Sequence, residues 1–400
     1  MNIKKISKNQ SLLEIKDLKI EGSSDEFWHP IIKGIDVTLK RGEIMGLIGE
    51  SGAGKSTLGL AAMGYTQPGC RITGGSIVFN GSELVNAPES QKRRLWGTKI
   101  TYVAQSAAAS FNPAHRLINQ TVAAKIRAKI SDEQTAKNDA RELFKTLQLP
   151  DSDTIGERFP HQVSGGQLQR VMTAMAISPR PDLIIFDEPT TALDVTTQVE
   201  VLAAMRGIVE EFNTAAIYIT HDLAVVAQMA DFIKVLRYGE EVEQSPTREM
   251  LKSPKMPYTK SLWSVRSIQK PEETSDDRIL SLKGIDASYG KVKVLHQVNI
   301  DVSRGKTLAV VGESGSGKST AARVITGLLP QTNGEIFFDG EALPVTLKAR
   351  SKEQKRRIQM IYQMADTAMN PRQTVGEIIG RPLEFYLGLK GEAQETRAIE

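Results

Sequence analysis

The chain has 400 residues, of which 40% are hydrophobic and 24% charged, and a formal net charge of +4. This length predicts two or three domains with cores of their own, and the mild basic excess permits an anionic partner or a membrane surface without indicating nucleic acid. The single cysteine, Cys70, excludes an internal disulfide framework and a multi-cysteine metal site, and it favours a reducing cytosol. No apolar run approaches the roughly 18 residues of a membrane span and no signal peptide is recognisable, so we expect any membrane role to come through a partner.

Two strands are predicted near the N-terminus, at residues 12–20 and 31–39, because apolar residues alternate with polar or charged ones there. The intervening residues 27–30 read as a turn that carries two aromatic side chains. Phe27 and Trp28 either pack locally or form a stacking surface for adenine, an interaction worth about 1–3 kcal/mol per base.

A glycine-rich stretch follows an apolar run at residues 44–48 and fits the phosphate-binding pattern G-x-x-x-x-G-K-[ST]. Small residues let successive backbone N–H groups face phosphate oxygens, and the helix expected next adds partial positive charge. We expect Lys55 to reach the β- and γ-phosphates and the Ser56 hydroxyl to ligate Mg²⁺. A chance glycine-rich turn is the alternative, which the strand and helix flanks disfavour. The predicted nucleotide-binding loop consists of Gly49, Glu50, Ser51, Gly52, Ala53, Gly54, Lys55, Ser56 and Thr57.

Further elements are predicted downstream of this loop. Residues 74–81 read as a strand ending in an Asn-Gly turn, residues 100–105 as a strand that delivers Gln105, and residues 121–149 as helical. A Ser-Gly-Gly-Gln stretch then opens a helical run, which would make a second anion-binding helix end, although a simple turn and N-cap is the favoured explanation when the stretch is taken alone. Its residues are Ser164, Gly165, Gly166 and Gln167.

Two carboxylates end a continuous apolar run at residues 181–188, a run typical of a parallel sheet covered on both faces. Nucleotides bind at the carboxyl ends of such strands. We expect Asp187 to hold Mg²⁺, directly or through water, and Glu188 to orient and activate the attacking water. A second strand, residues 215–220, leads to His221, which could contact the γ-phosphate and that water. A solvated strand end and a structural histidine are the alternatives.

The order of these motifs resembles the nucleotide-binding domain of ATP-binding cassette (ABC) proteins over residues 11–266. The resemblance implies an α/β P-loop NTPase fold with an antiparallel β subdomain, a RecA-like core and a helical subdomain. It makes Gln105 the Q-loop residue, a ligand of Mg²⁺ and part of the catalytic set with Glu188 and His221. It also makes residues 192–194 the D-loop.

The same resemblance makes residues 163–167 the family signature, with Val163 where leucine is commonest. Its Ser164 and Gly166 are expected to act in trans on ATP held by an opposing domain. Residues 69–75, 110–113 and the Pro-Tyr-Thr tail at 257–259 look like the oligopeptide/dipeptide permease branch. That branch usually has histidine where this chain has Met256. Its members import peptides, glutathione, nickel, opines and related solutes.

A second, incomplete copy of the pattern begins after a polar stretch. Gln363 and Asn370-Pro371 repeat Gln105 and Asn112-Pro113 at a common spacing, and Tyr289 is spaced like the adenine-stacking aromatic of the family. Ser319 and Gln363 are the implied Mg²⁺ ligands of this copy. The second nucleotide-binding loop consists of Gly312, Glu313, Ser314, Gly315, Ser316, Gly317, Lys318, Ser319 and Thr320.

These observations predict three regions: a first nucleotide-binding domain with a C-terminal extension at residues 11–267, a linker at 268–278, and the N-terminal part of a second domain at 279–400. At the spacing of the repeat, the signature, catalytic glutamate and histidine of the second copy would fall beyond residue 400. Either the chain is a truncation or another chain completes the site.

The resemblance implies a subunit of an ABC importer that binds and hydrolyses ATP with Mg²⁺ on the cytoplasmic face of the bacterial inner membrane. Its implied partners are transmembrane permease subunits, a solute-binding protein and a second cassette in cis or in trans, with no nucleic acid. One alternative is a soluble tandem-cassette ATPase acting on ribosomes, which the short linker disfavours. Another is a truncated, ATP-binding but catalytically idle chain. A kinase or small GTPase is disfavoured because neither uses a Ser-Gly-Gly-Gln motif before an Asp-Glu strand.

Overall fold

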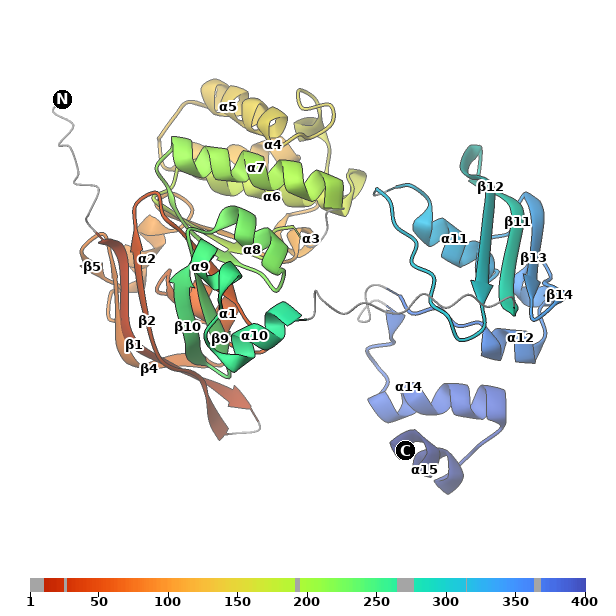
Figure 1. Cartoon of the computed structure of the whole chain (residues 1–400). Helices are drawn as coiled ribbons and strands as arrows, with labels where there is room; N and C mark the ends of the chain where they lie inside the picture. The colour runs from red at the N-terminus through yellow and green to blue at the C-terminus, as the bar shows by residue number, and fades with distance from the viewer. Residues whose placement is uncertain (1–10, 25–26, 191–194, 265–276, 314, 363–367) are drawn as a thin grey trace. The chain divides into compact units, whose positions relative to one another are not determined.

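The computed structural model describes residues 11–24, 27–190, 195–264, 277–313, 315–362 and 368–400. The chain divides into two compact units, Met1–Gln269 and Lys270–Glu400, each with its own core (Figure 1). Most of the expected linker, residues 268–276, lies outside the described residues. No helix in the described ranges is both long enough and apolar enough to cross a bilayer.

An antiparallel sheet in the order β2-β1-β4-β5 opens the first unit. Residues 27–30 were expected to form a turn, and this expectation is wrong because they belong to β2, where Trp28 pairs with Ser23 and Pro30 with Glu21. Pro30 is tolerated because β2 is an edge strand, where a missing N–H breaks no ladder. The strands are β1 (Ser11–Ser24), β2 (Phe27–Lys40), β4 (Cys70–Phe79) and β5 (Ser82–Glu83). The expected Asn80-Gly81 turn joins the last two, with positive φ at both residues.

A second sheet, in the order β10-β9-β3-β8-β7-β6, forms the centre of the first unit, and all its pairs are parallel except β9 with β10. Strands β3, β7 and β8 are buried along their whole length, as their unbroken apolar sequences predict. The strands are β3 (Ile44–Ile48), β6 (Ile100–Val103), β7 (Leu183–Asp187), β8 (Ala215–Ile219), β9 (Phe232–Arg237) and β10 (Glu240–Pro246).

Helices cover this sheet in Figure 1. Residues 121–149 were expected to be helical throughout, but they contain the end of α4 and the whole of α5, separated by residues 128–132, where Lys129 adopts a positive φ. Asp132 caps α5 by accepting a hydrogen bond from the Thr135 amide. The helices are α1 (Lys55–Ala61), α2 (Glu89–Leu95), α3 (Ala107–Ser110), α4 (Leu117–Arg127), α5 (Glu133–Thr146), α6 (Gly165–Ile177), α7 (Val195–Glu211), α8 (Leu223–Met229), α9 (Thr247–Lys252) and α10 (Pro257–Ser264).

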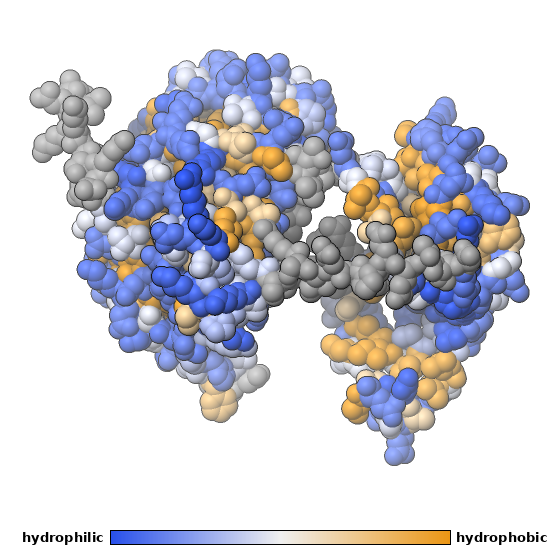
Figure 2. All heavy atoms as spheres, viewed as in Figure 1, coloured by the Kyte–Doolittle hydropathy of each residue, from blue (hydrophilic) through white to orange (hydrophobic). Residues whose placement is uncertain are grey.

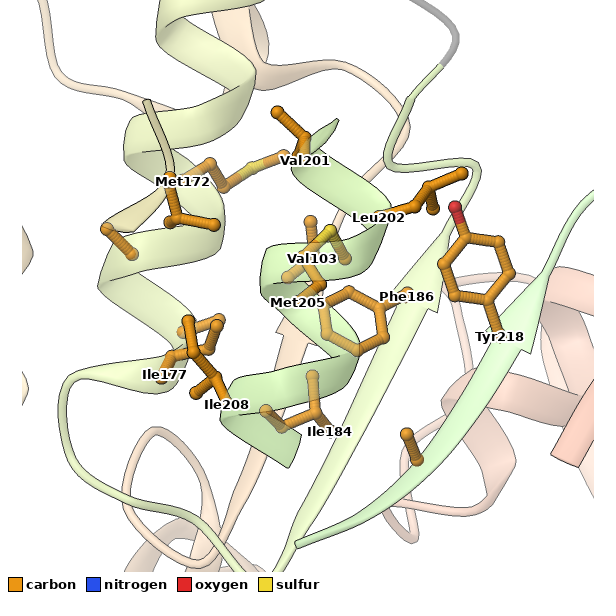
Figure 3. Close-up of a cluster of buried hydrophobic side chains, with 14 of the residues drawn as sticks. Val103, Met172, Ile177, Ile184, Phe186, Val201, Leu202, Met205, Ile208 and Tyr218 are labelled. Carbon is orange, nitrogen blue, oxygen red and sulfur yellow. The ribbon is translucent and has the colours of Figure 1, made fainter. Parts of the chain in front are cut away.

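The largest hydrophobic core lies between the central sheet and the helices α6 and α7. Figure 3 shows Phe186 of β7 and Tyr218 of β8 among side chains of α6 and α7, with the Phe186 ring beside Met205, and these three residues are fully buried. The rings of Phe186 and Tyr218 are 5.8 Å apart. This packing holds the C-terminal ends of β7 and β8 in place. Glu188 follows β7 directly, and His221 follows shortly after β8.

The second unit contains an antiparallel sheet in the order β12-β11-β13-β14, which repeats the first sheet of the first unit. Within its described residues, the apolar stretch that corresponds to β3 forms no strand, and Val310 and Val311 are 52% and 87% exposed. Apolar side chains, orange in Figure 2, are visible on the surface of this unit. The elements are β11 (Arg278–Tyr289), β12 (Val292–Ser303), α11 (Lys318–Ile325), β13 (Asn333–Phe338), β14 (Glu341–Ala342), α12 (Lys352–Arg357), α14 (Val375–Pro382) and α15 (Glu392–Ile399).

Candidate nucleotide site

The predicted phosphate loop of the first unit lies between β3 and α1, as its flanks indicated. Gly49 must be glycine, because a Cβ atom there would lie 2.2 Å from the Leu236 carbonyl oxygen. Gly54 caps α1 in the left-handed conformation, with φ of 93°, and a Cβ would lie 2.6 Å from Ile32. The loop is therefore pressed against β9 at one end and against β2 at the other.

Lys55 begins α1, yet its side chain turns back over the loop. Its ammonium donates hydrogen bonds to the carbonyl oxygens of Gly49 and Glu50, both at 2.8 Å. Burial lowers the pKa of Lys55 below its ordinary value, and the carboxylates of Glu188 and Asp187 partly offset this. A buried cation whose hydrogen bonds within the described residues go to neutral carbonyl oxygens is well placed to receive an anionic ligand such as a phosphate.

Ser56 and Asp187 meet beside the lysine. The Ser56 hydroxyl donates to one carboxylate oxygen of Asp187 at 3.1 Å, and the Tyr102 hydroxyl donates to the other at 2.6 Å. Burial and the bond to Asp187 raise the pKa of Tyr102, which keeps it protonated as a donor. A hydroxyl beside a carboxylate matches Mg²⁺, which takes one or two protein oxygens and completes its shell with phosphate and water. The residues present therefore fit this ion.

Glu188 is held from two directions. The Gln105 amide donates to one carboxylate oxygen at 3.0 Å, and His221 Nδ1 lies 3.0 Å from the other. Glu188 has a positive φ of 49°, which is uncommon for a residue with a side chain. The strand ends β6, β7 and β8 thus bring Gln105, Glu188 and His221 together, although they lie far apart in the sequence.

The Ser-Gly-Gly-Gln stretch opens α6 with a reciprocal cap. The Gln167 amide donates to the Ser164 hydroxyl at 3.3 Å, and the Ser164 amide donates to the Gln167 side chain at 3.0 Å. Gly165 and Gly166 form the first turn of this helix. No hydrogen bond in the described residues joins this stretch to the phosphate loop of the same unit.

The described residues of the second loop repeat two features of the first. Lys318 donates to the carbonyl oxygens of Gly312 and Glu313, both at 2.7 Å, and Gly317 caps α11 with φ of 95°. Ser319 follows Lys318 on α11, as Ser56 follows Lys55 on α1. Several predicted residues lie outside the described residues: Ser314, Gln363 and the D-loop at 192–194.

The two predicted adenine-stacking aromatics have different surroundings. The Trp28 ring is covered on one face by the Arg71 guanidinium, 3.9 Å from the ring centroid, and the residue is 42% exposed. Tyr289 is also 42% exposed and accepts a hydrogen bond from Arg323 of α11 at 3.0 Å. That bond lowers the pKa of Tyr289. Each aromatic retains exposed ring surface on which a base could stack.

Sequence reasoning did not single out Tyr102 or Gln169, which support the site from behind. Tyr102 stands three residues before Gln105, and only its approach to Asp187 reveals its role. Gln169 is buried and donates to the carbonyl of Ala104, directly before Gln105, so that α6 supports the Q-loop residue. The signal in the sequence for Gln169 is a polar residue on the apolar face of a helix, since buried polar groups need hydrogen-bond partners.

A phosphate loop after a buried parallel strand, with a carboxylate pair and a histidine at the neighbouring strand ends, defines a P-loop nucleoside triphosphatase. The model of the family described as "ABC transporter" matches residues 32–191 and 295–400. The chain belongs to the ABC transporter family and is an ATP-binding cassette ATPase.

Curated relatives and solved structures agree with this assignment. The "Glutathione import ATP-binding protein GsiA" of Salmonella choleraesuis (strain SC-B67) is 31% identical over 95% of this chain and 69% of that relative. The protein of the same name from Escherichia coli (strain K12) is 30% identical over 97% of this chain and 69% of that relative. The solved structure titled "Dimeric Structure of MJ0796, a Bacterial ABC Transporter Cassette" has a TM-score of 0.54 and 24% identity, and the match covers 59% of this chain and 99% of that one.

Proposed function

We propose that the chain is the ATP-hydrolysing subunit of an importer that takes up peptides or related small solutes through a separate membrane permease. The observation that carries the proposal is the position of the Glu188 carboxylate, which Gln105 and His221 hold at the strand ends. The neighbouring Asp187 accepts a hydrogen bond from Ser56 of the phosphate loop. The proposed solute class rests on relatives named for glutathione import.

The residues of the first unit divide the work of hydrolysis among them. Loop amides and Lys55 bind the phosphates of ATP, and Ser56 and Asp187 would hold Mg²⁺, which neutralises charge on the phosphate oxygens. Glu188 orients a water molecule and accepts its proton as the water oxygen attacks the γ-phosphorus. The bond from that phosphorus to the bridging oxygen breaks, and ADP leaves with the electron pair. His221 and Gln105 keep the carboxylate aimed, and the Gln105 amide oxygen would add a metal ligand.

The proposed partners supply the second half of the ATP site and the membrane pathway. Ser164 to Gln167 would cap ATP bound to an opposing cassette, in cis or in trans, since a helix N-terminus with free amides attracts phosphate. The second loop, with Lys318 and Ser319, would bind a second ATP beside Tyr289, and Trp28 would stack on the first adenine. Permease subunits and a solute-binding protein supply the pathway and the specificity, and the subunit would work at the cytoplasmic face of the bacterial inner membrane.

Co-purification and turnover test the proposal together. The tagged chain, expressed in its own organism, should co-purify with permease subunits from detergent-solubilised membranes, and the complex should hydrolyse ATP. Co-sedimentation with ribosomes and no permease partner would support the ribosomal alternative instead. A complex without turnover would support the idle, ATP-binding alternative.

A further inference from the structure

The C-terminal extension of the first unit reaches back to the phosphate loop. The Glu50 amide donates a hydrogen bond to the Tyr258 hydroxyl of α10 at 3.2 Å. We propose that Tyr258 is a positioning residue that holds the phosphate loop in its nucleotide-binding conformation, and that α10 thereby sets the affinity of the first site. The inference rests on the proposed nucleotide binding at residues 49–57.

One peptide group links this tyrosine to the phosphate-binding lysine. The Gly49 carbonyl accepts from Lys55 at 2.8 Å, and the N–H of the same peptide group is the Glu50 amide that donates to Tyr258. Hydrogen bonds at the two ends of one peptide strengthen each other. When Lys55 turns to a phosphate, the carbonyl loses its donor, and the bond to Tyr258 still keeps the plane of this peptide in place.

The tyrosine ring is itself held by a neighbouring cation. Its ring faces the Arg237 guanidinium, 4.5 Å from the ring centroid, at the end of β9. The preceding residue, Leu236, is the one whose carbonyl oxygen leaves no room for a Cβ at Gly49. The end of β9 therefore contacts both the loop and the residue that holds it.

The helix that carries Tyr258 is anchored by a buried carboxylate. Glu243 of β10 accepts hydrogen bonds from the amides of Lys255 and Met256, at 2.9 and 3.0 Å, just before α10 begins. Leu262 and Trp263 of α10 pack against the main core. The position of the Tyr258 hydroxyl is thus determined by the folded unit and not by a free tail.

The test uses the full-length chain with Lys318→Ala, so that only the first site reports. A fluorescent ATP analogue is titrated against this background in the presence of Mg²⁺. Tyr258→Phe removes the hydroxyl and keeps the ring on Arg237, so we expect the Kd to rise about three- to tenfold, the range of one neutral hydrogen bond. The free energy of unfolding without nucleotide should fall by no more than the contribution of one such hydrogen bond. In the active complex, KM for ATP should rise with kcat retained.

Two further variants separate positioning from mere folding. Tyr238→Phe is the matched control, since Tyr238 also stacks on Arg237, and its Kd should match the parent. In a Glu243→Ala background, which releases α10, Tyr258→Phe should add nothing further. An unchanged Kd in Tyr258→Phe, or equal effects of the two tyrosine variants, would overturn the inference. Lys55→Ala separates the positioning role of Tyr258 from the proposed nucleotide site. If the nucleotide still binds to Lys55→Ala with the parent Kd, the proposed function itself is overturned.

Discussion

His221 Nδ1 lies 3.0 Å from Oε1 of Glu188, and the Gln105 amide occupies the other oxygen of the same carboxylate. A carboxylate held at both oxygens by groups from different strand ends has little freedom to rotate. Its direction therefore depends on the relative positions of three strand ends and not on its own rotamer alone.

Glu188→Gln removes the proposed proton acceptor with almost no change of shape. We expect ATP turnover of the permease complex to fall by about two to four orders of magnitude, the usual contribution of a general base, while ATP binding is kept. Phosphate release and nucleotide titration measure the two quantities. Glu89→Gln, on the exposed face of α2, is the control and should leave turnover unchanged. Turnover close to that of the parent in Glu188→Gln would remove Glu188 from the mechanism.

Tyr102→Phe removes the donor to the carboxylate of Asp187, which we propose as a Mg²⁺ ligand. Loss of such a supporting bond typically costs about 10- to 100-fold in metal affinity, so the Mg²⁺ concentration for half-maximal turnover should rise by that factor. A Mg²⁺ titration at saturating ATP makes the measurement. Tyr65→Phe serves as the control, because the Tyr65 ring packs edge-on against Trp96 and away from Asp187. The assignment of Asp187 to the metal would be wrong if the titration curves coincided.

Features set by local sequence were predictable, and features set by tertiary approach were not. The phosphate loops, the buried strands and the Ser164 cap depend on residues that are neighbours in the chain. Tyr102 and Tyr258 act on residues that are distant in sequence, and no local pattern indicates which backbone or carboxylate they reach. Residues 27–30 were expected to form a turn between two strands, but they pair with β1 as part of β2, and the strand pattern read locally does not show this pairing.

The two phosphate loops should bind nucleotide separately. Each lysine closes on two carbonyl oxygens of its own loop, so we expect two nucleotides per chain, and one after either Lys55→Ala or Lys318→Ala. Equilibrium dialysis with radiolabelled ATP measures the number of nucleotides bound per chain. Lys92→Ala, on α2, is the control and should still bind two nucleotides per chain. A Lys318→Ala chain that still bound two nucleotides would exclude the second loop as a site.

The anchor of α10 should weaken in acid. Burial raises the pKa of Glu243, but the hydrogen bonds from the amides of Lys255 and Met256 outweigh this and hold the pKa below its ordinary value. A carboxylate with a lowered pKa stabilises the fold fully above its unfolded pKa of about 4.3 and loses this as the pH falls through the folded pKa. The excess thermal stability of the parent over Glu243→Gln should therefore shrink below that pH. A difference that stayed constant from neutral to acid pH would contradict this assignment.

Phe186→Ala should destabilise the first unit by about 3–5 kcal/mol, because it leaves a cavity between β7 and α7. All three tryptophans of the chain, Trp28, Trp96 and Trp263, belong to this unit, so tryptophan fluorescence in urea reports its unfolding. Phe186→Leu fills most of the space and should cost about 1 kcal/mol. An equal loss of unfolding free energy in the two variants would mean that the surrounding core relaxes into the space of the missing ring.

The positive φ of Glu188 links the thermal stability of this protein to the identity of residue 188. A side chain in that backbone region costs of order 1–3 kcal/mol, and glycine would relieve the strain. A selection for heat resistance alone would therefore favour Glu188→Gly, which also removes the proton acceptor that we propose for hydrolysis. Thermostable variants of the cassette should be sought with position 188 held fixed.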